Sequence, residues 1–119
     1  MSKMIYLEPT KITEDERVSR LRVTLHKEHK YGLDKIEWYS PAIYFLWLEG
    51  RIVYIGQSIN VRGRILQHLA TSPHIKFDRV SYKPYNRSKL DAKEKKFILK
   101  YMPIHNKKII QGYKSQLES

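Results

Sequence analysis

Glu94 is the first residue whose position suggests chemistry, because a carboxylate stands where the sequence predicts an apolar helix face. Apolar residues recur with helical spacing after Ser88, and Glu94 falls between Phe97 and Ile98 on that face. An unpaired carboxylate would be costly to bury there. The sequence therefore predicts a partner for Glu94, either Arg64 or a lysine in an internal ion pair, or a divalent metal ion.

Two tyrosines and a basic pair precede Glu94 in the chain. Arg64 and His68 are four residues apart in a predicted helix, so they share one face. Tyr44 and Tyr54 lie in predicted strands. Each residue also has an ordinary structural interpretation: the tyrosines as strand aromatics, Arg64 as the ion-pair partner of Glu94, and His68 as a packed or capping histidine. The residue types alone leave both interpretations open.

Residues 42–56 are predicted to form a β-hairpin around the turn Glu49-Gly50. Residues 42–48 and 51–55 are rich in the aromatic and β-branched residues typical of strands. A two-residue loop would place the two tyrosines on opposite faces. A three-residue loop with Gly50 in the left-handed position would place Tyr44 directly opposite Tyr54. Glycine at the third loop position favours the second register.

A helix and a strand are predicted to follow the hairpin. The helix is expected over residues 59–70, with Ser58 or Asn60 as its cap. Gly63 lies inside it at a propensity cost of about 1 kcal/mol, which indicates a close approach of backbone nearby. A third strand is expected over residues 76–83.

Capping-box patterns mark two more helices, one at each end of the chain. Ser88 and Asp91 form the pattern for the last predicted helix, which ends before Pro103. Thr13 and Glu16 form it for an N-terminal helix. The N-terminal helix is interpreted as a packing helix with a solvated charged face, or alternatively as a helix that contacts DNA or another subunit.

Positive charge is concentrated in the second part of the chain. The 119 residues have a net charge of +11, and residues 41–119 hold 15 of the 23 Lys and Arg side chains but 5 of the 12 acidic ones. This surplus predicts a polyanionic partner, and nucleic acid fits better than a membrane because no basic amphipathic helix is flanked by Trp or Phe. The absence of cysteine excludes disulfides, thiolate metal sites and a thiol nucleophile. Without a signal peptide or a long apolar run, a soluble cytoplasmic protein is expected.

Taken together, these residues resemble the GIY-YIG nucleases. Ala42-Ile43-Tyr44 stands where that family has Gly-Ile-Tyr, and Tyr54-Ile55-Gly56 matches the second element. Arg64 and His68 follow at the family spacing. The pattern closes with Glu94, Ile98, Pro103 and Asn106. The resemblance covers residues 42–108. It departs from the family at Ala42, which replaces a glycine, and at the neutral Gln57, near which some members have a lysine.

The resemblance implies an α/β (α+β) fold with a central three-stranded antiparallel sheet flanked by helices. This agrees with the predicted order of hairpin, helix, strand and helix, to which the N-terminal helix is an addition. The chain would then divide into a helical extension over 1–40, a nuclease-like domain over 41–110 and a C-terminal tail over 111–119.

The resemblance also implies hydrolysis of a DNA phosphodiester with one Mg²⁺ or Mn²⁺ ion. Glu94 would hold the metal, Arg64 would contact the phosphate, and one of Tyr44 and Tyr54 would act as general base, with its pKa lowered by nearby cations. His68 would be a supporting base or proton shuttle. Completing the candidate site are Asn106, which would secure it, and four residues that would contact DNA: Arg62, Lys93, Lys96 and Lys100.

Two other functions compete with the nuclease. A DNA-binding module of this fold that has lost turnover and acts with a partner is the main alternative, and a structural subunit would leave the positive charge unexplained. One active site cuts one strand, so a double-strand break would require two copies or two events. Target recognition would come from residues 1–40, a second copy of the chain or a partner protein. Restriction, homing and repair roles all stay open.

Overall fold

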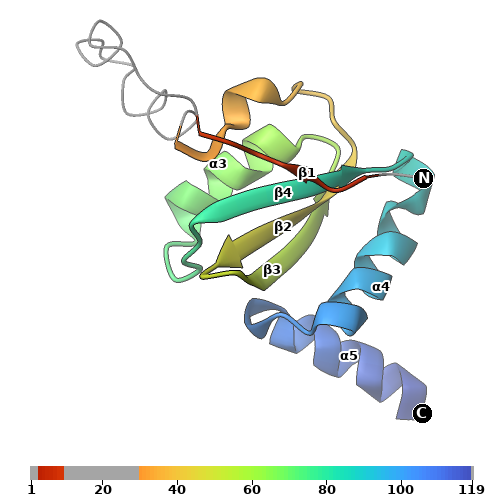
Figure 1. Cartoon of the computed structure of the whole chain (residues 1–119). Coiled ribbons are helices and arrows are strands. Elements are labelled where there is room, and N and C mark those ends of the chain that lie inside the picture. The colour runs from red at the N-terminus through yellow and green to blue at the C-terminus, as the bar shows by residue number, and fades with distance from the viewer. Residues whose placement is uncertain (1–2, 10–29, 119) are drawn as a thin grey trace, which may run out of the picture.

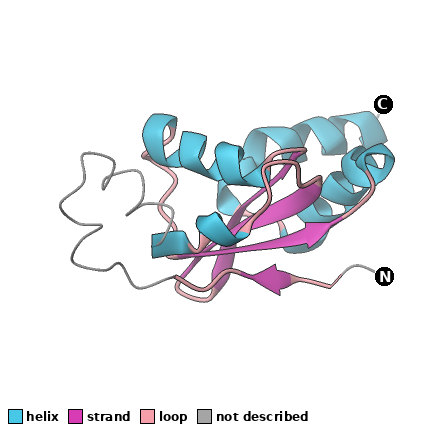
Figure 2. Cartoon of the chain, turned by 90° about the horizontal axis from the view of Figure 1, so that it is seen from above, coloured by secondary structure: helices cyan, strands magenta, loops and turns pink. Residues whose placement is uncertain are grey.

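The computed structural model describes residues 3–9 and 30–118, which form one antiparallel sheet with helices on both faces (Figure 1). The strands are β1 (Ile5–Tyr6), β2 (Ala42–Leu48), β3 (Arg51–Ser58) and β4 (Arg79–Pro84), in the order β1-β4-β2-β3. The helices are α3 (Val61–Thr71), α4 (Leu90–Tyr101) and α5 (Lys107–Glu118). Figure 2 shows the strands fanning out as the sheet twists. The predicted mixed α/β class is confirmed.

The sheet contains a fourth strand that the sequence did not predict. β1 pairs antiparallel with β4, Ile5 with Tyr82 and Tyr6 with Ser81. Two residues are too few to show an alternating pattern, so only the partner strand reveals this element. The predicted number of three strands was therefore wrong, although all three predicted strands are present. The predicted N-terminal helix, which begins at Thr13, lies outside the described residues.

Each face of the sheet packs against its own helices. Successive side chains of a strand point to opposite faces, so Tyr44 and Leu46 of β2 face α3, whereas Ile43 and Phe45 face α4 and α5. Because both faces are covered, β2 is an almost continuous apolar run. Ala42 is fully buried in the core on the α3 side, where its small methyl group fits.

The hairpin has a register that the predicted three-residue loop does not describe. Glu49 and Gly50 both have positive φ, 51° and 79°, as a two-residue type I′ turn requires, so the predicted loop was wrong. A bulge then shifts the pairing by one residue, so that Leu46 pairs with Tyr54 and Tyr44 with Gly56. The bulge returns Tyr54 to the face of Tyr44. The two tyrosines therefore lie diagonally on one face rather than directly opposite.

Asn60, one of the two predicted caps, is the N-cap of helix α3. The Asn60 side-chain oxygen accepts a hydrogen bond from the Gly63 backbone N–H at 2.9 Å. A Cβ built on Gly63 would lie 2.7 Å from the Asn60 amide nitrogen. The close approach at Gly63 therefore comes from the capping side chain, not from backbone as predicted.

The C-terminal helices differ from the prediction. The Ser88–Asp91 capping box does not form: α4 begins at Leu90 after a 3-10 turn, and no side chain caps it. Asp91 accepts a hydrogen bond from the Gln57 amide at 2.6 Å instead. Helix α5 was not predicted and includes residues assigned to the C-terminal tail. Its buried Ile110 packs in the core on the α4 side of the sheet.

Candidate active site

Tyr44 reaches across strand β3 because its partner there is a glycine. Tyr44 pairs with Gly56, and a Cβ built on Gly56 would overlap Cζ and Oη of Tyr44 and lie 2.8 Å from its Cε1. No other amino acid fits beneath this ring without moving it. β3 is an edge strand of the sheet, so the Tyr44 hydroxyl is carried toward the edge where Glu94 approaches.

Tyr44 and His68 form a buried hydrogen-bonded pair. The Tyr44 hydroxyl lies 2.7 Å from His68 Nε2, and only 2% of the Tyr44 side chain is exposed. Both tyrosine rings also contact the imidazole, with centroids 5.6 Å (Tyr44) and 4.9 Å (Tyr54) away. His68 Nδ1 is buried and has no hydrogen-bond partner within the described part of the chain. The predicted helix face thus points His68 at the tyrosine pair.

Burial dominates the protonation of this cluster. It raises the pKa of Tyr44 far above its usual value, and the neighbouring Tyr54 raises it further, whereas Arg64 lowers it. Burial also raises the pKa of Tyr54, although the neighbouring Tyr44 hydroxyl and the charge of Arg64 act to lower it. Burial and Arg64 both lower the pKa of His68. Arg64 thus lowers the pKa of both tyrosines, as expected of a nearby cation, but burial outweighs it in the free protein.

Glu94 approaches the same cluster from α4 but forms no ion pair with Arg64. Its carboxylate accepts a hydrogen bond from the Gln57 amide at 3.2 Å. Burial raises the pKa of Glu94, the Gln57 amide lowers it and the like charge of Asp91 raises it. Glu94 in turn raises the pKa of both Tyr44 and Tyr54, which places it within electrostatic reach of them. The Arg64 guanidinium is exposed and donates to Gln67 on its own helix at 3.2 Å.

Among the described residues the Glu94 carboxylate has no cationic partner, and a divalent cation could supply one. It is half-buried, and none of the groups that shift its pKa is a cation. Residues 3–9 and 30–118 contain no cluster of three or more His, Cys, Asp or Glu side chains, so an all-protein metal cage is absent from this part of the chain. Mg²⁺ is commonly held by one or two carboxylates with water and substrate phosphate. The residues present fit that kind of site.

Asn106 supports the site rather than contacting the cluster. Its side chain is 2% exposed, and its oxygen accepts from the Ile55 backbone N–H while its amide donates to the Ile55 carbonyl, both at 2.9 Å. Ile55 lies between Tyr54 and Gly56 on the edge strand. Asn106 therefore satisfies the Ile55 N–H and carbonyl, which would otherwise be unpaired on this edge strand, and holds Tyr54 and Gly56 in place.

Three neighbours of Glu94 were not among the predicted site residues. Gln57 was noted only as a departure from the family, yet its amide donates to both Glu94 and Asp91. Asp91 was assigned to a cap, although its spacing of three from Glu94 on a helix was a usable signal. Burial raises the pKa of Tyr113 on α5, and the Glu94 and Asp91 charges raise it further. Tyr113 therefore lies within electrostatic reach of these two carboxylates.

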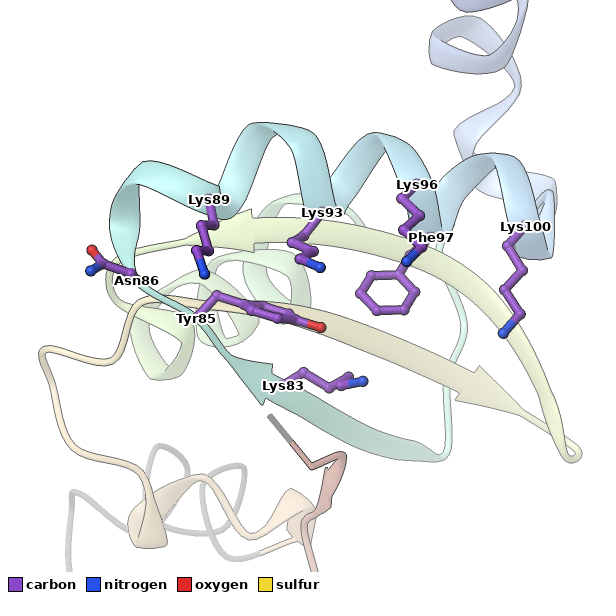
Figure 3. Close-up of a pocket in the computed structure, with 8 residues that line it drawn as sticks. All are labelled: Lys83, Tyr85, Asn86, Lys89, Lys93, Lys96, Phe97 and Lys100. Carbon is purple, nitrogen blue, oxygen red and sulfur yellow. The ribbon is translucent and has the colours of Figure 1, made fainter. Parts of the chain in front are cut away.

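The four predicted DNA contacts do not lie together. Lys93, Lys96 and Lys100 line a groove between α4 and the end of β4 (Figure 3). This groove opens on the opposite side of α4 from the Gln57 amide that holds Glu94. Arg62 is placed elsewhere, on α3, with its guanidinium 4.1 Å from the centroid of the Trp38 ring.

Comparison with known proteins adds no relative. No family model matches the chain, and no curated protein or solved structure matches it significantly. The resemblance to the GIY-YIG nucleases therefore rests on the residues and their spacing in the sequence. Of the helices in the described part of the chain, none is both long and apolar enough to cross a membrane.

Proposed function

We propose that this protein is a metal-dependent DNA endonuclease of the GIY-YIG type. The observation that carries the proposal is the convergence of four groups from three elements. Tyr44 of β2 is hydrogen-bonded to His68 of α3, and both Arg64 of α3 and Glu94 of α4 act electrostatically on the tyrosine pair. An acid–base pair, a guanidinium and an unpaired carboxylate are the groups that phosphodiester hydrolysis needs.

The tyrosine pair and His68 would move the proton of the attacking water. The water would give its proton to the Tyr44 hydroxyl, directly or through the Tyr54 hydroxyl, while Tyr44 passes its own proton to His68 Nε2, which leaves an imidazolium. The hydroxide would bond to phosphorus and the bond to the 3′-oxygen would break, with solvent supplying the proton to that oxygen. Arg64 would pair with the phosphate oxygens, which its guanidinium geometry matches.

Glu94 would hold Mg²⁺ or Mn²⁺ in this proposal. The bound ion supplies Lewis-acid stabilisation of charge on the phosphate and the leaving oxygen. Gln57 orients the Glu94 carboxylate through its amide, and Asp91 shares that amide. We further propose that the protein acts in the cytoplasm on DNA and nicks one strand per encounter, with a second copy or a partner protein selecting the target.

The test is plasmid and branched-DNA cleavage by wild type and Glu94→Gln, with Mg²⁺, Mn²⁺ or EDTA. Glu37→Gln is the matched control. Glu37 is exposed, and its substitution removes the same charge at a position away from the site. We expect metal-dependent nicking by wild type and Glu37→Gln and a loss of at least about 100-fold in Glu94→Gln. Cutting by Glu94→Gln at the wild-type rate would refute the proposal. Comparing Tyr44→Phe with Tyr54→Phe then identifies the hydroxyl that accepts the proton.

One observation favours a second function, a DNA-binding module without turnover. Tyr44 is almost fully buried, and burial raises the pKa of both tyrosines, so neither is poised as a base in the free protein. Such a module would bind both DNA substrates and cut neither with any metal. In that case Glu94→Gln would bind DNA as tightly as wild type with or without metal.

A further inference from the structure

A groove rich in lysine and aromatic side chains separates α4 from the end of β4. It has a volume of about 680 Å³. Figure 3 shows lysines descending from α4 toward Tyr85 and Lys83, with the Phe97 ring between them. Its lining residues are Lys83, Tyr85, Asn86, Lys89, Lys93, Lys96, Phe97 and Lys100. Five of these eight are lysines and none is acidic, so the groove is a concentrated positive surface.

Four of the groove lysines, three on α4 and one at its N-cap, form a single row. Lys89, Lys93, Lys96 and Lys100 have spacings of four, three and four residues, which place them on one side of the helix. With a rise of about 1.5 Å per residue the row is about 16 Å long. Like charges at this spacing repel one another, by a few tenths of a kcal/mol per pair. A row of cations with no acidic neighbour in the groove is typical of a surface that binds a polyanion.

Aromatic rings lie between these cations. The Lys83 ammonium is 5.9 Å from the Tyr85 centroid and 5.2 Å from the Phe97 centroid, and that of Lys93 is 5.3 Å from Tyr85. Phe97 is stacked in turn on the exposed Tyr101, at 6.4 Å between centroids. Cations along a groove with aromatic faces among them are the combination that binds single-stranded nucleic acid. The bases of a duplex are paired and stacked inside it and cannot reach such rings.

The groove is separate from the candidate active site. Its β-strand side is β4, whereas Glu94 is held by Gln57 of β3, and β2 lies between these two strands. At about 4.8 Å per strand, the two sides are about 10 Å apart across the sheet. We propose that this groove binds single-stranded nucleic acid, with lysines on the phosphates and Tyr85 against a base. Strand binding does not rest on the proposed nuclease activity.

The test is fluorescence polarisation of a labelled dT12 oligonucleotide in EDTA, where cleavage does not occur. Lys93→Ala/Lys96→Ala removes two groove cations. Lys107→Ala/Lys108→Ala, the matched control, removes two exposed lysines of α5 outside the groove. At about 0.1 M salt one lost phosphate contact weakens single-strand binding about fivefold, so the groove variant should bind about 25-fold more weakly and lower the salt slope by about 1.4. The control should change binding less than about threefold.

Other probes and variants decide the nature of the ligand. Tyr85→Leu should weaken dT12 binding at least about fivefold, because base stacking is lost while the apolar contact remains. If Tyr85→Leu lowers the melting temperature, Lys89→Ala/Lys100→Ala provides the second test, since both residues are exposed. rU12 distinguishes an RNA from a DNA strand. Equal losses in the groove and control variants, or tighter binding of duplex or polyglutamate than of dT12 through the same lysines, would overturn the proposal.

The nuclease and strand-binding proposals fail separately. Absence of cutting with intact groove-dependent dT12 binding would refute only the nuclease. Metal-dependent cutting that Glu94→Gln abolishes, with dT12 binding insensitive to the groove lysines, would refute only the groove. Glu37→Gln lies outside both the groove lining and the candidate active site and serves as a further control in the binding assay.

Discussion

Replacing Gly56 by alanine tests whether the Tyr44 ring is held where the structure places it. A methyl group on Gly56 would overlap the outer atoms of that ring, which is almost fully buried and bonded to His68. Overpacking a dense site costs about 1–3 kcal/mol. If the ring is displaced, both partners of a buried hydrogen bond lose it, which adds about 1–3 kcal/mol. We therefore expect Gly56→Ala to lower the free energy of unfolding by about 2–6 kcal/mol.

The measurement is urea unfolding followed by circular dichroism, with Gly112→Ala as the matched control. A Cβ on Gly112 of α5 meets nothing within 4 Å, so alanine should stabilise the helix there by up to about 1 kcal/mol. Tyr44→Leu removes the ring atoms that clash, so Gly56→Ala should cost at least about 1 kcal/mol less in that background. Equal effects of the two glycine substitutions, or costs that simply add with Tyr44→Leu, would refute this account of Gly56.

The remaining predictions concern stability at three other positions. Burial and Arg64 lower the pKa of His68 below 6.5, so the unfolded chain binds the proton more readily than the folded protein. The free energy of unfolding should therefore fall as the pH drops below about 6.5. Thermal melts of His68→Gln should lose this part of the pH dependence. Asn106→Ala leaves the Ile55 N–H and carbonyl without partners and should cost about 2–4 kcal/mol in urea unfolding, whereas the exposed Asn86→Ala should cost under about 0.5. Asn60→Ala should cost about 1 kcal/mol because it removes a formed cap, while Ser88→Ala should be nearly neutral; equal costs would contradict the cap assignment.

Local patterns predicted most of the elements that carry the site. The hairpin, α3, β4 and α4 have strong periodic signals, and the spacing of Arg64 and His68 placed them on one helix face. The same helical wheel placed Glu94 on the apolar face of α4, and the structure leaves it half-buried there. These inferences depend only on neighbours within a few residues, and helix geometry makes such neighbours predictable.

The side-chain partners were less predictable, because they come from distant parts of the chain. Gln57 and Asp91 are 34 residues apart, and Ile55 and Asn106 are 51 apart, so no local pattern records either hydrogen bond. Asp91 fits a capping box in sequence, yet the Gln57 amide competes for its carboxylate. β1 and α5 were missed for the same reason, since each is defined by what it packs against.

By itself, the sequence determined the mixed α/β class, the concentration of positive charge after residue 40 and the set of residues available for chemistry. Only the tertiary structure decided how those residues meet. The bulge in β3 restored the two tyrosines to one face, and burial raised their pKa values by more than the nearby Arg64 lowered them. The physical reason is that register, desolvation and long-range hydrogen bonds depend on the packing of the whole chain, whereas charge and helical spacing can be read along it.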